Sequence, residues 1–202
     1  GGVNTEYVDL GLPSGLKWAK CNIGAKTETD YGDYFMWGST KANTPDECRW
    51  KNAPFNNGSD SYNSTYFNSV KDTVCPNGIL AKEYDAAAQI MGGNWRMPTK
   101  GDCRELARDT TNEWIEDFKG TGVNGMKFTS KTDTTKYIFI PAAGGCVEGS
   151  MFNVGDEGHV WSSSLDPEWV QPTSFYMYFT SDDWDYNDMA ICVGQSVRGV
   201  FK

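Results

Sequence analysis

The segment from Trp161 to Val200 holds most of the side chains whose types and spacing suggest chemistry, and that chemistry is contact with a ligand. Its two ends, Trp161–Ser164 and Ser196–Val200, are plain, whereas aromatic side chains stand among Asp, Asn and Gln between them. Large rigid aromatics beside small hydrogen-bonding groups supply contact area at a low cost in conformational entropy. The sequence therefore predicts a ligand-binding surface formed by Trp169, Tyr176, Tyr178, Asp183, Trp184, Asp185, Tyr186 and Asn187.

Strand periodicity divides this set further. Because side chains along a strand point alternately to its two faces, we expect Tyr176 and Tyr178 on the exposed face and every second residue in the core. The expected core residues are Phe175, Met177 and Phe179. The remaining aromatics stand in Asp-rich sequence that is typical of a loop, where contact with a partner is favoured: Trp169, Trp184 and Tyr186.

Catalytic chemistry has weaker signals. The only histidine is His159, where a structural role is expected, and Ser162–Ser164 lack the Gly-x-Ser-x-Gly elbow of a hydrolase. Two carboxylates could act together in a glycosidase, but the spacing singles out no pair. Gly92–Gly93 and Gly144–Gly145 lack the surroundings of a nucleotide site. We therefore expect no enzymatic activity and no cofactor.

Four residues are expected to support the scaffold. Arg96 and Arg198 stand in the two most regular motifs, where guanidinium groups tie loops to backbone carbonyls or carboxylates. Trp95 and Trp161 stand in similarly regular motifs, and we assign them the same kind of structural role.

Six cysteines are spread along the chain without a Cys-x-x-Cys pair, so zinc-ribbon and thioredoxin-like sites are not indicated, and we expect no metal site. In an exported protein this even count permits disulfides. The alternative is that several cysteines are small buried hydrophobic residues.

The bulk composition limits the possible partners. The 202 residues fit one domain, residues 1–202, with a substantial core. A formal net charge of −9 and the lack of a basic cluster disfavour nucleic acid and anionic membranes as partners. No apolar run reaches the roughly 18 residues of a membrane span, so direct membrane insertion is not expected. The chain begins Gly1-Gly2-Val3-Asn4 without the regions of a signal peptide, and we favour a mature exported fragment over a cytosolic protein.

The elements that must position these residues are short. Tyr7–Ala19 is expected to form two strands around a Pro-Ser-Gly turn, and residues 39–77, rich in Asn, Ser, Asp and Pro, are expected to form a long surface loop. One helix is predicted at Leu80–Met91, and a second after Pro98, with Thr99 as N-cap, Asp102 at N3 and no helix signal after Asp109. Strands are predicted at 126–130, 136–141, 159–163, 174–179, 190–193 and 197–201. Two helices packed on antiparallel sheets indicate the α+β class.

Several motifs, taken in order, resemble those of one family. They are Tyr7–Ala19, Tyr31–Phe35, Gly92–Thr99, Gly122–Gly125, Ile138–Gly144, Val160–Ser164 and Ser196–Val200. Together they resemble the Fibrobacter succinogenes major paralogous domain family, which is abundant in gut Bacteroides and their relatives.

The resemblance implies a C-type lectin-like fold, shared with the variable proteins of diversity-generating retroelements and with the formylglycine-generating enzyme. In the variable proteins the ligand surface lies on strands and loops near the C-terminus, which correspond here to Trp169–Gln195. The resemblance also implies an outer-membrane lipoprotein or a secreted protein at a bacterial cell surface. Retroelement mutagenesis of adenines yields Asp, Tyr and Ser but not Trp, so Trp169 and Trp184 fit poorly as diversified positions.

Calcium-dependent sugar binding has only a faint signal. Gln171–Thr173 and Tyr186–Asp188 are similar to the ligand motifs of true C-type lectins, but Thr173 stands where the first motif needs a carboxylate. The favoured interpretation is a non-catalytic module that binds a glycan or a protein. The alternatives are a structural or adhesive module of a fimbrial or surface assembly and, more remotely, a calcium-dependent lectin or a hydrolase.

Overall fold

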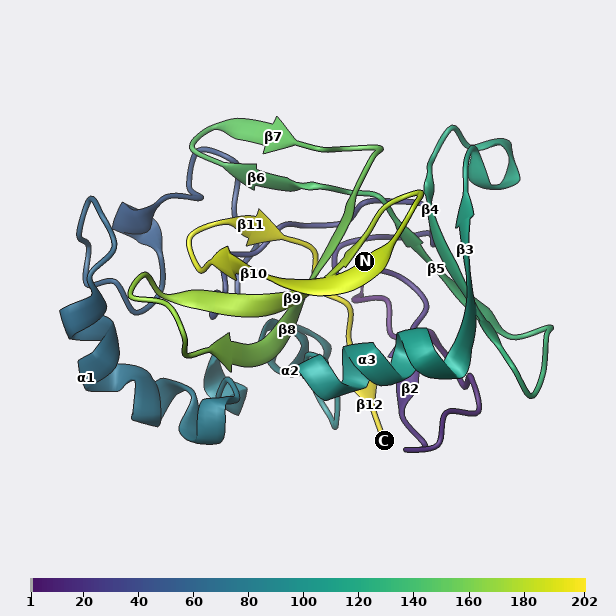
Figure 1. Cartoon of the computed structure of the whole chain (residues 1–202), viewed down its shortest axis with the longest axis horizontal. Helices are drawn as coiled ribbons and strands as arrows, with labels where there is room; N and C mark the ends of the chain where they lie inside the picture. Colours follow the sequence, from purple (N-terminus) through teal and green to yellow (C-terminus); the bar gives the residue numbers. More distant parts are fainter. Residues whose placement is uncertain (1) are drawn as a thin grey trace.

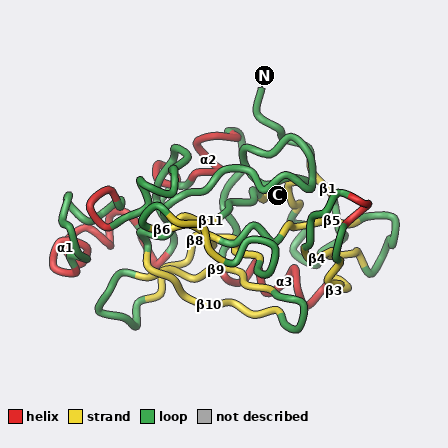
Figure 2. Tube along the Cα trace, turned by 90° about the horizontal axis from the view of Figure 1, so that it is seen from above, coloured by secondary structure: helices red, strands yellow, loops and turns green. Residues whose placement is uncertain are grey.

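The computed structural model describes residues 2–202 and combines small antiparallel sheets with a few helices and long connecting segments (Figure 1). The predicted α+β class is confirmed. Loops make up much of the trace in Figure 2, in which β8, β9 and β10 lie side by side. Among the described residues, no helix is long and apolar enough to cross a membrane.

One sheet joins the first strands of the chain to the last. The predicted strands around the Pro-Ser-Gly turn are confirmed as β1 (Tyr7–Val8) and β2 (Lys17–Ala19), which pair antiparallel. The other edge of β2 pairs with β12 (Val200–Phe201). The C-terminal motif is thereby held against the N-terminal one.

A second sheet contains the predicted pair of central strands. β4 (Gly125–Ser130) and β5 (Tyr137–Pro141) are antiparallel neighbours, as expected. The sequence did not predict β3 (Thr110–Ile115), which follows a helix directly and pairs with the free edge of β4.

Two further sheets hold the C-terminal half. β10 (Trp184–Ala190), β9 (Thr173–Phe179) and β8 (Gly158–Asp166) form one sheet in that order. The other sheet has the order β11 (Gly194–Gln195), β6 (Gly145–Val147) and β7 (Ser150–Phe152).

The predicted strand at 190–193 is wrong. The tight turn after β9, in which the Thr180 N–H donates to the Asp183 carbonyl at 2.9 Å, pairs Trp184 with Phe179. Because a hairpin turn sets the register, the strand begins at Trp184 and ends at Ala190, and the following apolar residues form a buried turn. The Asp-rich sequence therefore lies largely on a strand and not in a loop.

The second predicted helix is confirmed as α3 (Lys100–Asp109). The Thr99 hydroxyl accepts from the Asp102 N–H at 3.2 Å, and the Asp102 carboxylate accepts from the Thr99 N–H at 2.9 Å, which completes the capping box. The first predicted helix is shorter than expected. As α2 it covers only Ala86–Met91, because the Asp85 carboxylate caps it by accepting from the Ala88 N–H at 2.9 Å.

The segment 39–77, predicted to be a long surface loop, contains a further helix, α1 (Ser64–Val74). The Asn63 side chain caps it by accepting from the Tyr66 N–H, and Phe67 and Val74 turn into the core. Intrinsic propensity is weak in this polar segment, so the buried apolar face decides the structure. The described residues thus hold three α-helices where two were predicted.

The core formed by residues 2–202 consists of three buried clusters. The first packs α3 against β2, β4, β5 and one face of β9, the second gathers around Trp37 and Trp161, and the third lies around Cys48, Cys146 and Cys192. Trp161 is fully buried, and its indole N–H donates to the Phe35 carbonyl at 2.7 Å. Trp95 is half-buried and packs edge-on against Phe201.

Arg198 is a charged residue inside this core. Its side chain is 0% exposed and donates to the Asn22 side chain and to the carbonyls of Ala19, Lys20 and Phe139, at 2.8 to 3.1 Å. Burial lowers the pKa of the guanidinium to about 10. Arg96 is more exposed, and its guanidinium donates to the Asp102 carboxylate at 2.7 Å and to the Met97 carbonyl at 3.0 Å.

Candidate ligand-binding surface

The sheet β8–β9–β10 positions most of the predicted contact residues, and it divides them between its two faces. Residues opposite each other in an antiparallel pair share a face. Trp184 and Tyr186, opposite Phe179 and Met177, therefore lie on the face toward α3. The other face carries Tyr176, Tyr178, Asp185 and Asn187.

The expectation that Tyr176 is exposed is wrong. Only 3% of its surface is accessible, and its ring stacks on His159 and packs edge-on against Trp161. Burial and the Glu157 carboxylate raise the pKa of its hydroxyl. Phe175, expected in the core, is half-buried on the α3 face, where the Lys100 ammonium lies 3.7 Å from its ring centre. Both faces of this sheet are covered, so simple alternation does not separate core from surface.

Trp169 lies apart from the other predicted contacts. It is 60% exposed and stands in the β8–β9 connection, next to Val170, which is 74% exposed. This connection joins the Thr173 end of β9, whereas Trp184 pairs with Phe179 at the other end. At about 3.3 Å per residue the two tryptophans are separated by roughly the length of the strand, about 20 Å.

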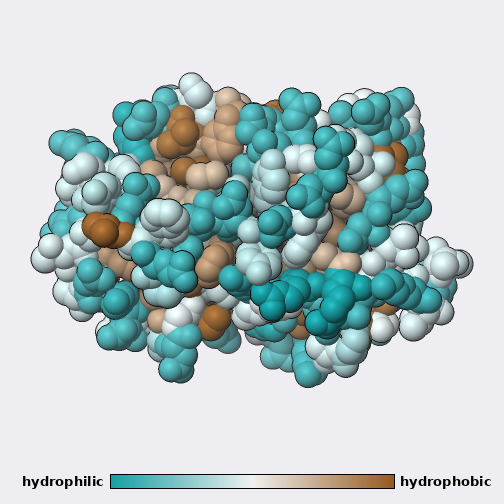
Figure 3. Space-filling model, viewed as in Figure 1, coloured by the Kyte–Doolittle hydropathy of each residue, from teal (hydrophilic) through white to brown (hydrophobic). Residues whose placement is uncertain are grey.

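A cleft on the α3 face brings two predicted residues together with residues that the sequence did not single out. We name it the α3–β10 cleft, with a volume of about 520 Å³. The side chains of α3, β3, β4 and the β9–β10 turn form its walls, and the exposed side of α3 is hydrophilic (Figure 3). Its lining residues are Arg104, Ala107, Arg108, Asn112, Trp114, Met126, Ser181, Asp182, Asp183 and Trp184.

Cations from α3 hold the aromatic residues beside this cleft. Arg104 donates to the Tyr186 hydroxyl at 3.0 Å, and the Lys100 ammonium lies 4.1 Å from the Tyr186 ring centre. The rings of Trp184 and Tyr186 meet edge-to-face with centroids 6.3 Å apart. Such cation–π and edge-to-face contacts fix the rings before any ligand arrives. Packing between elements that are far apart in the chain carries no local sequence signal, which explains why Arg104 on α3 and Trp114 on β3 were missed.

The polar residues of β10 protect its free edge. The amides of Trp184, Tyr186 and Asp188 each donate to the side chain of the preceding residue, at 2.8 to 2.9 Å. These acceptor side chains belong to Asp183, Asp185 and Asn187. Because β10 is the edge strand of its sheet, its backbone N–H groups could otherwise pair with a strand from another chain. The two carboxylates and the Asn187 amide oxygen accept hydrogen bonds from these N–H groups instead. Part of the predicted contact set therefore has a structural role.

The opposite face holds a buried polar network around the histidine. His159 is 2% exposed, and its two ring nitrogens lie 2.8 Å from the Gln195 side-chain oxygen and 2.7 Å from Glu157. The Tyr178 hydroxyl donates to Glu157 at 3.3 Å, and desolvation together with this carboxylate raises the pKa of that hydroxyl. The Ser162, Ser163 and Ser164 hydroxyls contact backbone atoms instead of the imidazole. The histidine–serine pair of a catalytic triad is not assembled here.

The faint calcium motifs do not converge. Asn187 and Asp188 are consecutive on β10 and point to opposite faces, and Thr173 begins β9 opposite Ala190. Within residues 2–202, no group of three or more His, Cys, Asp or Glu side chains is placed to hold a metal ion.

Comparisons with protein-family models, with curated proteins and with solved structures found no match for this chain.

Proposed function

We propose that this chain is a non-catalytic binding module that takes a protein ligand in the α3–β10 cleft. The observation that carries the proposal is the convergence of Trp114, Trp184, Tyr186, Arg104 and Arg108 from three separate elements. Trp, Tyr and Arg are the residue types that dominate the binding energy of protein interfaces. The Tyr186 ring, already fixed by Lys100 and Arg104, loses little entropy on binding.

The edge of the cleft at the β9–β10 turn favours basic groups on the partner, whereas Arg104 and Arg108 on α3 favour acidic or hydrogen-bonding groups opposite them. Asp182 and Asp183 are exposed at its edge, and the whole chain has a formal net charge of −9. Rim charges of this kind steer association more than they add affinity. The motif resemblance to the Fibrobacter succinogenes major paralogous domain family supports a C-type lectin-like fold and export to a bacterial cell surface, as a lipoprotein or a secreted protein.

The proposal is tested by probing a protein array and a glycan array in parallel with the purified chain. A protein ligand found in this way should bind the Arg104→Ala and Asp182→Lys variants at least about 10-fold more weakly. Both side chains are exposed, so these changes spare the core. Trp184→Ala is less suitable, because Trp184 packs against the first core cluster.

Trp169→Ala is the matched control, because it removes an exposed tryptophan at the far end of the sheet and should leave the affinity unchanged. Protein binding that survives both cleft substitutions would place the site elsewhere. Signals on the glycan array alone would overturn the choice of a protein ligand.

A further inference from the structure

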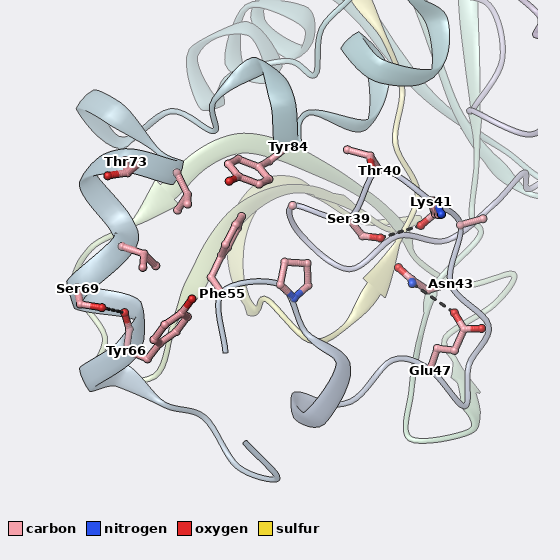
Figure 4. Close-up of a pocket in the computed structure, with 15 residues that line it drawn as sticks. Ser39, Thr40, Lys41, Asn43, Glu47, Phe55, Tyr66, Ser69, Thr73 and Tyr84 are labelled. Carbon is pink, nitrogen blue, oxygen red and sulfur yellow. Dashed lines mark hydrogen bonds between the residues drawn. The ribbon is translucent and has the colours of Figure 1, made fainter. Parts of the chain in front are cut away.

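A larger hollow lies between α1 and the segments that follow Trp37 and precede α1 (Figure 4). Its volume is about 830 Å³, and small-molecule sites typically have roughly 300 to 1,000 Å³. We name it the loop–helix pocket. Its walls hold residues from the segment that the sequence left without a role, among them Ser39, Lys41, Glu47, Phe55, Tyr66 and Thr73, together with Tyr84.

One side of the pocket is aromatic. Phe55 and Tyr84 meet edge-to-face with centroids 5.0 Å apart, and Tyr66 projects from α1 toward them (Figure 4). Phe55 has a φ of 65°, a left-handed conformation that bulky residues rarely adopt. Gly38 leaves room for the ring, because a Cβ there would lie 2.5 Å from it. Contacts within the chain therefore position the aromatic wall without a ligand.

The chain around the pocket is also held firmly. Asn56 is 0% exposed, and its amide nitrogen contacts the carbonyls of Trp50, Ser59 and Ser61 at 2.8 to 3.0 Å. Its carbonyl oxygen accepts from the Asn63 N–H at 2.7 Å, one residue before α1 begins. A single buried side chain thus ties the segment carrying Phe55 to the helix carrying Tyr66.

Residues with hydroxyl groups line the pocket on several segments. Ser39 and Ser69 donate to the backbone carbonyls of Lys41 and Tyr66, at 2.8 and 2.6 Å, so their oxygens remain as acceptors. In the part of the chain that the structure describes, four other hydroxyls make no side-chain hydrogen bond: those of Thr40, Tyr66, Thr73 and Tyr84. Each can donate and accept. A ligand that is itself rich in hydroxyl groups satisfies such a set.

The charges of the pocket cancel. Lys41 is the only basic and Glu47 the only acidic side chain in the lining. The Asn43 amide donates to Glu47 at 3.4 Å, and its oxygen accepts from the Met36 N–H at 2.9 Å. A charged ligand of either sign would meet a like charge, Lys41 for a cation and Glu47 for an anion, and a purely aliphatic one would leave the hydroxyls without partners, which costs free energy.

We propose that the loop–helix pocket binds a neutral sugar, with the C–H face of one ring against Tyr66 and Phe55 and the hydroxyl edge toward Ser39–Asn43 and Glu47. The aromatic wall and the ring of hydroxyls match the two chemical faces of a saccharide. This site shares no lining residue with the α3–β10 cleft, so the two sites can be tested independently.

Calorimetric titration of the full chain tests the proposal with a panel of neutral methyl hexosides and neutral disaccharides. Glucuronic acid serves as an anionic probe and cyclohexanol as an apolar probe. At least one neutral sugar should bind with a stoichiometry of one, while both other probes bind at least about 10-fold more weakly. If no neutral sugar gives a saturable signal, or if either other probe binds as tightly, the proposal is wrong.

Variants locate the binding. Tyr66→Ala should weaken the sugar at least about 10-fold, whereas Tyr66→Phe, which keeps the ring, should weaken it less. Thr73→Trp, an exposed change on α1 that fills the pocket, should abolish binding. Tyr62→Ala removes a tyrosine that is 43% exposed and outside the lining, and it should bind as the unchanged chain does. Equal affinity of Tyr66→Ala and Tyr62→Ala would refute the site.

Discussion

Replacing Arg198 by methionine should cost more stability than most single substitutions. The change keeps a long apolar stem but removes every donor from a side chain that is 0% exposed. It leaves four acceptors without their partner: the Asn22 side-chain oxygen and the carbonyls of Ala19, Lys20 and Phe139. At about 1 kcal/mol for each orphaned acceptor, the expected loss in free energy of unfolding is about 4 kcal/mol.

One effect works in the opposite direction. Burial lowers the pKa of Arg198, so keeping the guanidinium charged inside the fold has a cost that methionine removes. This gain in stability is smaller than the loss, because the backbone carbonyls stay buried and cannot reach water in place of the guanidinium. Arg198→Lys keeps a charge but concentrates its donors on one nitrogen, so we expect an intermediate loss of about 2 kcal/mol.

The measurement is urea-induced unfolding, followed by tryptophan fluorescence and by far-ultraviolet circular dichroism, whose transitions must coincide for a two-state treatment. Arg108→Met is the matched control, because this arginine is exposed on α3 and pairs only with its neighbour Asp109, so the unfolding midpoint should not move. If Arg198→Met costs less than about 1 kcal/mol, the acceptors do not depend on this side chain and the reasoning fails.

Three other predictions follow from the same contacts. Thr99→Ala should lower the free energy of unfolding by about 1 kcal/mol through loss of the α3 cap, and Thr99→Ser should restore it; equal melting curves for both would refute this. The thiols of Cys48 and Cys146 lie 3.6 Å apart, and exchange with oxidised glutathione during refolding should join them, with a gain of about 3 kcal/mol; peptide mapping that finds a different pair would contradict it. Removing the caps of the β10 edge by replacing Asp183, Asp185 and Asn187 with Ala should cause self-association visible by sedimentation. The Asp72→Ala, Glu83→Ala variant, which has the same net charge, should stay monodisperse, and association of both variants would point to charge alone.

Local signals in the sequence predicted much of the secondary structure. The Thr99 and Asp102 pair places the start of α3 correctly, because a capping box needs only residues three positions apart. The strands at β4, β5, β8 and β9 follow from alternation and turn residues in the same way.

Long-range packing decided the elements that the sequence did not predict. Helix α1 depends on a core face that Phe67 and Val74 supply only once other segments are in place. Strand β10 depends on the register set by the Thr180–Asp183 turn, whereas the local pattern of residues 184–187 on its own indicates a loop.

The candidate sites show the same limit. Asp183 and Trp184 were predicted and lie in the α3–β10 cleft, but Trp114 and Arg104 reach it from elements far away in the sequence. Tyr176 was misplaced because alternation predicts which residues share a face, not whether a second layer covers that face. The loop–helix pocket had no sequence signal beyond the length of its segment.

The pairing of β2 with β12 has a consequence for folding kinetics. Lys17–Ala19 complete their ladder only with Val200–Phe201, and Arg198 contacts residues 176 to 179 positions earlier in the chain. Closing a loop of nearly the whole chain costs conformational entropy before the stabilising contacts between its ends have formed. Domains with such long-range contacts fold slowly. During synthesis, one edge of β2 therefore lacks its partner strand until Val200 and Phe201 have been made. Truncation after Gln195 should therefore leave an unfolded chain and not a slightly destabilised one, since the last residues close the core.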